Sequence, residues 1–147
     1  MPSKFPARIM PIALWAARIT LGATLLSAVA DRFGLWGPYG SPRATWGDWA
    51  HFVHYCGVVN SFAPAALIPA LAWISTILEI VFGLALIIGF QLELAAYGSA
   101  ILFTLFALAM TWSLGIKAPL NYSVFADAGG ALLLGALVTL SKLPANP

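Results

Sequence analysis

The sequence predicts an all-α membrane protein: a polytopic four-helix bundle with a short interfacial helix in its first outer loop. Of the 147 residues, 61% are hydrophobic and only 8% are charged, whereas soluble domains average roughly 25% charged residues. The apolar residues also gather into stretches of about 20, the length that crosses a bilayer as a helix. A chain this short has too small an interior to hide so much apolar surface from water. We therefore expect one membrane domain, residues 1–147, and not a soluble enzyme.

Four apolar stretches are long enough to span the bilayer. They cover residues 9–30, 66–89, 94–115 and 122–140. Backbone groups inside lipid must find their hydrogen-bond partners within each segment, so these stretches should be helices. The connections after the second and third stretches are short, which makes the neighbouring helices antiparallel.

The long segment 31–65 is expected to form an outer loop. It opens with a turn-rich piece, residues 34–42, that contains three glycines and two prolines. Apolar and aromatic residues then recur at helical spacing. They are Trp46, Trp49, Phe52, Val53 and Cys56. Because Trp favours the head-group level of a membrane, a short helix in the plane of the interface should cover the mouth of the bundle.

The first stretch has a competing interpretation. Residues 28–30, Ala-Val-Ala, resemble a signal-peptidase site, and Lys4 and Arg8 resemble the basic start of a signal peptide. Cleavage there would leave three spans. The length of the stretch and Arg18 in its middle favour an uncleaved helix. With four spans, Lys4 and Arg8 favour cytoplasmic termini, although the positive charges on the two sides are otherwise balanced.

Three ionisable residues lie inside the predicted spans: Arg18, Glu79 and Asp127. Each costs about 2.5–3.5 kcal/mol near the centre of a spanning helix unless it faces inward and is paired. At about 1.5 Å per residue, Arg18 and Glu79 should lie at similar depths, near 14 Å, with Asp127 slightly higher. We therefore predict an Arg18–Glu79 ion pair with Asp127 close above it, and these three are the candidate catalytic residues.

Small residues share the helix faces of these charges, which indicates that the faces are helix–helix interfaces. Ser75, Thr76 and Gly83 lie on the face of Glu79. Three roles for the charges remain open: fixing helix register, forming a proton, quinone or small-molecule site, or contacting a partner protein.

Other kinds of site are not predicted. The spacing of His51, His54 and Cys56 does not place all three on one helix face, so no metal site is expected. A single cysteine excludes an internal disulfide and a CxxC redox pair. The net charge of +2, without a basic run, excludes a nucleic-acid partner. No haem, flavin or nucleotide motif is visible, and no covalently bound cofactor is expected.

Several segments resemble the DoxX-like family of small four-helix bacterial membrane proteins. The resemblance depends on Arg18, on residues 31–34 (Asp-Arg-Phe-Gly), on the block 72–89 with its pattern Glu79-x-x-x-Gly83, and on residues 120–125. It covers nearly the whole chain.

The resemblance implies an accessory subunit of a quinone-linked redox complex in the bacterial inner (plasma) membrane. It identifies Arg18 and Glu79 as the matching polar positions, but it does not transfer a ligand to this chain. Quinone is the candidate cofactor, because the family is named after a subunit linked to quinone-dependent oxidation, and electrons would come from a redox partner protein. Two other functions stay open from the residues alone, a small transporter or channel subunit and a structural assembly factor without catalysis. Homo-oligomer formation is also left open.

Overall fold

The computed structural model describes residues 9–142, and every regular element in this range is helical. Four helical segments are long and apolar enough to cross a membrane. They are α1 (Ile9–Arg32), η1 with α3 (Ala65–Leu67 and Ile68–Ile88), α4 (Leu92–Leu114) and α6 (Val124–Ser141). The predicted fold class, an all-α four-helix membrane bundle, is confirmed. The chain is a multi-pass integral membrane protein.

Alanines lie at the helix contacts in the interior of the bundle, together with larger side chains such as Leu25, Leu86 and Leu134, and large apolar side chains also cover its outside. Ala72, Ala96, Ala107 and Ala131 have no exposed surface, whereas Trp112 is 79% exposed. In lipid the hydrophobic effect does not drive helices together, so they associate through the close packing of small residues. The large apolar side chains on the outside then contact acyl chains.

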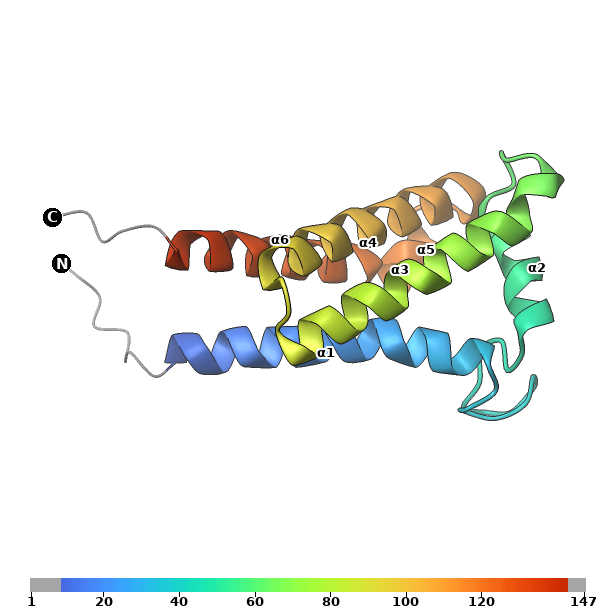
Figure 1. Cartoon of the computed structure of the whole chain (residues 1–147). Helices are drawn as coiled ribbons and strands as arrows, with labels where there is room; N and C mark the ends of the chain where they lie inside the picture. Colours follow the sequence, from blue (N-terminus) through green and yellow to red (C-terminus); the bar gives the residue numbers. More distant parts are fainter. Residues whose placement is uncertain (1–8, 143–147) are drawn as a thin grey trace, which may run out of the picture.

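The bundle consists of two closely packed helix pairs. α1 packs along α3, and α4 packs along α6. α3 also packs against α4, which joins the two pairs, while α1 and α6 contact each other much less. The first residues of α1 and the last residues of α6 lie at one end of the bundle, and α2 and α5 lie at the other end (Figure 1). We call the latter the outer end.

The turn between α3 and α4 lies toward the end of the bundle where α1 begins and α6 ends (Figure 1). Gly89 ends α3 with a left-handed φ of 78°, and its N–H donates to the carbonyl of Ala85 at 2.9 Å. Glycine adopts this conformation without a steric penalty. A side chain at Gly89 would also collide with the guanidinium of Arg18, which reaches over from α1.

A helix in the outer loop, α2 (Trp49–Val59), confirms the predicted short helix. It begins behind Asp48, whose carboxylate accepts a hydrogen bond of 2.9 Å from the backbone N–H of His51 and so caps the helix. It starts three residues later than the pattern indicated. The reason is the backbone before it: Gly47 has a left-handed φ of 67° and Asp48 is extended, so the helical conformation starts only at Trp49.

α2 lies across the outer end of the bundle (Figure 1). Its buried residues Phe52 and Cys56 pack in one cluster with Ile68 and Ala72 at the start of α3. This packing holds α2 over the space between the spanning helices, as expected for a helix that covers the mouth of the bundle.

The connection before α6 contains a short helix that the sequence did not predict, α5 (Lys117–Asn121). Ser123 follows it with a left-handed φ of 58° and interrupts the helical backbone. For this reason α6 begins at Val124, two residues after the predicted start of the fourth span. The other predicted span ends also differ from the structure by at most two residues.

The first residues of α1 and the last residues of α6 lie at the same end of the bundle, which agrees with four spans. α1 continues without a break through residues 28–30 to Arg32. Lys4 and Arg8, on which the cytoplasmic assignment depends, lie outside the described residues. The cytoplasmic side and the absence of cleavage therefore stay predictions.

Candidate functional site

A buried ion pair joins the outer end of α1 to the middle of α3. Arg32 is the last residue of α1, and its Nη1 contacts Oε2 of Glu79. Both residues are 2% exposed. The same Nη1 donates a hydrogen bond of 2.6 Å to the hydroxyl of Thr76, one turn before Glu79 on the same helix face. Because an isolated charge is costly inside a spanning helix, opposite charges placed together are the arrangement that a bilayer tolerates.

Aromatic rings from the outer loop close over this guanidinium. Cζ of Arg32 lies 3.7 Å from the ring centroid of Phe52 and 5.4 Å from that of Trp46. A desolvated cation over an aromatic face gains about 2 kcal/mol. Nε of Arg32 is buried and has no hydrogen-bond partner. One N–H donor therefore remains unused beside the pair.

The predicted ion pair between Arg18 and Glu79 is wrong. Arg18 lies toward the end of the bundle where α1 begins and α3 ends. Its Nε donates to the carbonyl of Leu86 and its Nη2 to the carbonyl of Ile87, each at 3.0 Å. These carbonyls belong to the last turn of α3, where helix carbonyls lack partners and carry the negative end of the helix dipole. Arg18 therefore caps α3.

The depth estimate failed because it placed the start of α1 level with the end of α3. α1 instead projects beyond the turn that follows α3 (Figure 1). Arg18 is consequently level with Leu86 and Ile87 rather than with Glu79. Arg32 was assigned to the outer loop, but the helix continues to it, and it reaches the level of Glu79.

A cavity of about 860 Å³ lies beside the ion pair. Arg32 and Glu79 are on its wall, and most of the other lining residues are apolar. Those from the helix interiors include Leu25, Leu78, Phe103, Phe106 and Met110. Small-molecule sites in proteins are typically about 300–1,000 Å³, mostly apolar, with a few polar groups that orient the ligand. This cavity has that character.

Asp127, in the first turn of α6, lines the same cavity and is half-buried. None of the ion pairs within residues 9–142 includes it. The placement of Glu79 and Asp127 around one central site agrees with the expectation from the sequence. Their catalytic role remains a prediction.

Sequence reasoning missed Arg32 and the two rings above it. The sequence did contain a signal that pointed to Arg32, because this residue belongs to the segment 31–34 that contributes to the DoxX-like resemblance. It also directly follows an apolar stretch long enough to continue as helix. Thr76 and Glu79, which share one face of the second predicted span, are the polar partners that a buried arginine at position 32 needs.

The outer loop holds a second polar group. Nδ1 of His51 lies 2.7 Å from Oδ2 of Asp48, and the imidazole stacks on the ring of Tyr39 with 3.6 Å between centroids. The hydrogen bond from the backbone N–H of His51 lowers the pKa of the Asp48 carboxyl. Within residues 9–142, no three His, Cys, Asp or Glu side chains come together as metal ligands would. His51 and Asp48 instead stabilise the start of α2.

Cys56 is expected to react slowly with N-ethylmaleimide. Its thiol is buried in the cluster between α2 and α3, and burial raises its pKa to about 11. Only the thiolate is reactive, so little of it is present at neutral pH. We expect labelling at pH 7.5 to be at least about tenfold slower than that of the Cys56→Ala, Ala50→Cys variant. Equal rates, measured by intact mass, would contradict the burial of Cys56.

These features define a class: a multi-pass α-helical membrane protein with a buried Arg–Glu pair beside a mainly apolar cavity. Comparison with protein-family models, curated proteins and solved structures finds no match. The particular function is therefore argued from the site itself.

Proposed function

We propose that the chain is a DoxX-like bacterial inner-membrane subunit that binds a quinone in the cavity beside Arg32 and Glu79. The observation that supports this most directly is the contact of a buried charged pair with a mainly apolar cavity inside a membrane bundle. A quinone has the complementary character, with carbonyl oxygens on an otherwise apolar molecule. In the proposed complex, one carbonyl accepts a hydrogen bond from Nε of Arg32, the donor that has no partner within the chain.

The margin of the cavity favours a ligand that arrives from the bilayer. Ile74 of α3 and Leu105 and Leu108 of α4 line the cavity and are each more than half exposed on the outside of the bundle. An apolar molecule in the membrane can therefore enter between α3 and α4 without crossing water. A water-soluble substrate would meet an apolar margin there instead.

The acidic residues supply the proton chemistry in this proposal. Reduction of a quinone takes up protons together with electrons. Of the two carboxyl groups that line the cavity, Asp127 is the one that takes part in none of the ion pairs within residues 9–142, so it exchanges the proton with the ligand. Glu79 holds Arg32 in place, and Arg32 takes the orienting role that was predicted for Arg18. The electrons come from a redox partner protein.

Quinone binding can be tested through the tryptophans that line the cavity, Trp46 and Trp112. The purified chain in lipid nanodiscs is titrated with decylubiquinone, and the quenching of tryptophan fluorescence is recorded. We expect saturable quenching. Arg32→Lys keeps the positive charge but removes the Nε–H donor. It should weaken binding by at least about tenfold, since hydrogen bonds that involve a charged group contribute about 1.5–3 kcal/mol.

Glu93→Gln is the matched control, because Glu93 lies at the other end of the bundle and contacts Lys142. It should leave quinone affinity unchanged. Quenching that never saturates in the wild-type chain would exclude the proposal. A purely structural ion pair would show a different result: Arg32→Lys would lower the thermal stability but leave the quinone affinity as in the wild type.

A further inference from the structure

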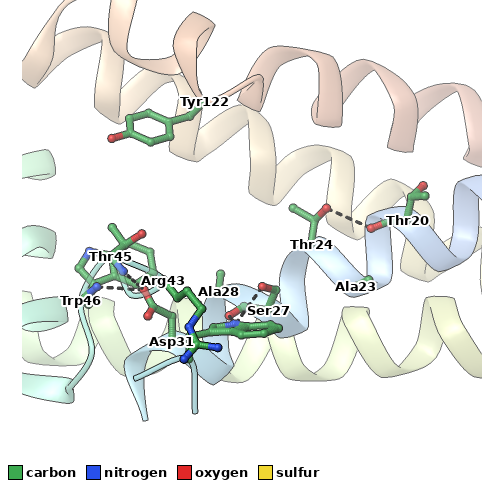
Figure 2. A pocket seen from close by; sticks show the side chains of 11 residues that line it. Thr20, Ala23, Thr24, Ser27, Ala28, Asp31, Arg43, Thr45, Trp46 and Tyr122 are labelled. Carbon is green, nitrogen blue, oxygen red and sulfur yellow. Dashed lines mark hydrogen bonds between the residues drawn. The ribbon is translucent and has the colours of Figure 1, made fainter. Parts of the chain in front are cut away.

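A second hollow, of about 890 Å³, lies along the outer half of α1, at the seam of this helix with the outer loop and with Tyr122, just before α6. Figure 2 shows Thr20, Thr24 and Ala28 of α1 along it, Asp31 and Trp46 at one end and Tyr122 across from them. Neither Arg32 nor Glu79 lines this hollow. It adjoins the cavity proposed for quinone, because five residues line both: Thr24, Ala28, Thr45, Trp46 and Tyr122. Asp31 and Arg43, in contrast, line only this hollow.

Asp31 presents an unused acceptor in this hollow. The residue is 5% exposed. Its Oδ2 accepts hydrogen bonds of 2.9 Å from the backbone N–H groups of Thr45 and Trp46, drawn as dashed lines in Figure 2. Its Oδ1 is buried and has no partner. Buried polar atoms are nearly always hydrogen-bonded in folded proteins, so a donor that is not part of the chain is expected at this oxygen.

Two donors of different kinds border the same hollow. Nε1 of Trp46 is buried without a partner. Arg43 is exposed, lines the hollow, and takes part in none of the ion pairs found within residues 9–142. The hollow thus offers one carboxylate oxygen, one indole N–H and one guanidinium.

We propose that this hollow binds the head group of phosphatidylethanolamine, a zwitterionic phospholipid with a primary ammonium. The ammonium donates a hydrogen bond to Oδ1 of Asp31, the phosphate pairs with Arg43, and a head-group oxygen accepts from Nε1 of Trp46. The acyl chains lie along the seam over Thr20 and Thr24. Trp36 and Tyr122 also line this hollow, as expected at the head-group level of a membrane.

The charges in the hollow explain why the head group of phosphatidylethanolamine is preferred over those of other phospholipids. The quaternary ammonium of phosphatidylcholine has no N–H, so it leaves Oδ1 of Asp31 without a donor. The phosphate of phosphatidylglycerol can pair with Arg43, but this head group has no cation and so leaves the carboxylate of Asp31 without a positive partner. Only a head group with both an N–H cation and a phosphate matches Asp31 and Arg43 together.

Lipid selectivity can be measured by native mass spectrometry of the detergent-purified chain. The protein is titrated with dioleoyl phosphatidylethanolamine, phosphatidylcholine and phosphatidylglycerol, and with free phosphoethanolamine. We expect phosphatidylethanolamine to bind about tenfold more tightly than phosphatidylcholine, because one charge-assisted hydrogen bond distinguishes them. Free phosphoethanolamine, which lacks the acyl chains, should bind much more weakly than the whole lipid.

Substitutions then test the two charges separately. Asp31→Asn should abolish the preference for phosphatidylethanolamine over phosphatidylcholine. Arg43→Gln should weaken the binding of all three phospholipids, whereas Lys117→Gln, at an exposed cation of α5 outside the hollow, should not. If Asp31→Asn fails to fold, the lipid binding of Arg43→Gln and the lipid selectivity of the wild-type chain test the proposal. Arg43 is exposed, so its substitution should leave the fold intact. Equal wild-type binding of the three lipids, or wild-type lipid binding by Arg43→Gln, would overturn the proposal.

The lipid experiment is done without added quinone, because the two hollows share five lining residues. Its failure is distinguishable from that of the quinone proposal through Glu79, which lines only the first cavity. Glu79→Gln alters the ion pair beside the first cavity and leaves the second hollow intact. It should therefore retain the preference for phosphatidylethanolamine whether or not the chain binds quinone.

Discussion

Replacing Arg32 with leucine is expected to lower the free energy of unfolding by about 3–5 kcal/mol, because removing one partner of a buried ion pair leaves the other charge without compensation. Glu79 is 2% exposed, and its carboxylate would lose the guanidinium that contacts it. Thr76 would also lose the hydrogen bond that it accepts from Arg32. Unfolding by SDS in mixed micelles, followed by circular dichroism, measures the loss.

The double variant Arg32→Leu, Glu79→Leu is the decisive comparison. Replacing both charges by apolar residues of similar volume is often neutral or stabilising in proteins, so the double variant should recover most of the stability lost by Arg32→Leu. Arg18→Leu provides a second comparison, because Arg18 bonds only to carbonyls at the end of α3. It should be clearly less destabilising. If Arg32→Leu proves no more harmful than Arg18→Leu, the ion pair contributes little.

Replacing Gly22 with leucine is expected to destabilise the bundle by about 3 kcal/mol, the upper end of the range for overpacked cores. Gly22 lies where α1 approaches α3 most closely. A Cβ there would come within 2.7 Å of Cγ1 of Ile87 and 2.9 Å of the backbone oxygen of Gly83. The backbone oxygen cannot move aside as a side chain can, so the two helices would have to separate. The same unfolding assay measures this effect.

Gly129→Leu is the matched control for this substitution. Gly129 lies in a spanning helix, α6, but it is exposed and has nothing within 4 Å of the position of a Cβ. Leucine there should be neutral or slightly stabilising, since glycine inside a helix is unfavourable by about 0.5–1 kcal/mol relative to alanine. Equal losses from Gly22→Leu and Gly129→Leu would show that bulk in any spanning helix is harmful, and not the approach of α1 to α3.

The two predictions are coupled through the position of α1. Gly22 sets how closely α1 approaches α3, and Arg32 reaches Glu79 from the outer end of the same helix. Separation of the helices by Gly22→Leu should therefore also weaken the ion pair. In a double-mutant cycle, Gly22→Leu and Arg32→Leu should then destabilise by less than the sum of their separate effects.

The spans themselves were predictable from the sequence because the bilayer imposes a simple rule on each helix separately. About 20 apolar residues are needed to cross it, and the backbone must be satisfied within the segment. The inward placement of Glu79 and Asp127 followed from the same physics, since a charge facing acyl chains is unfavourable. The helix of the outer loop also followed from local spacing, with an error of three residues at its start.

The partner of Glu79 could not be predicted in this way, because it depends on how far α1 projects beyond α3 and on where α1 ends. Both are set by packing between helices: the close approach at Gly22, and the loop residues Thr45 and Trp46, which bind Asp31 at the end of α1. The hydropathy of a segment determines that it spans the membrane. The relative depth of two spans is a property of their contacts, and only the tertiary structure placed Arg32, rather than Arg18, beside Glu79.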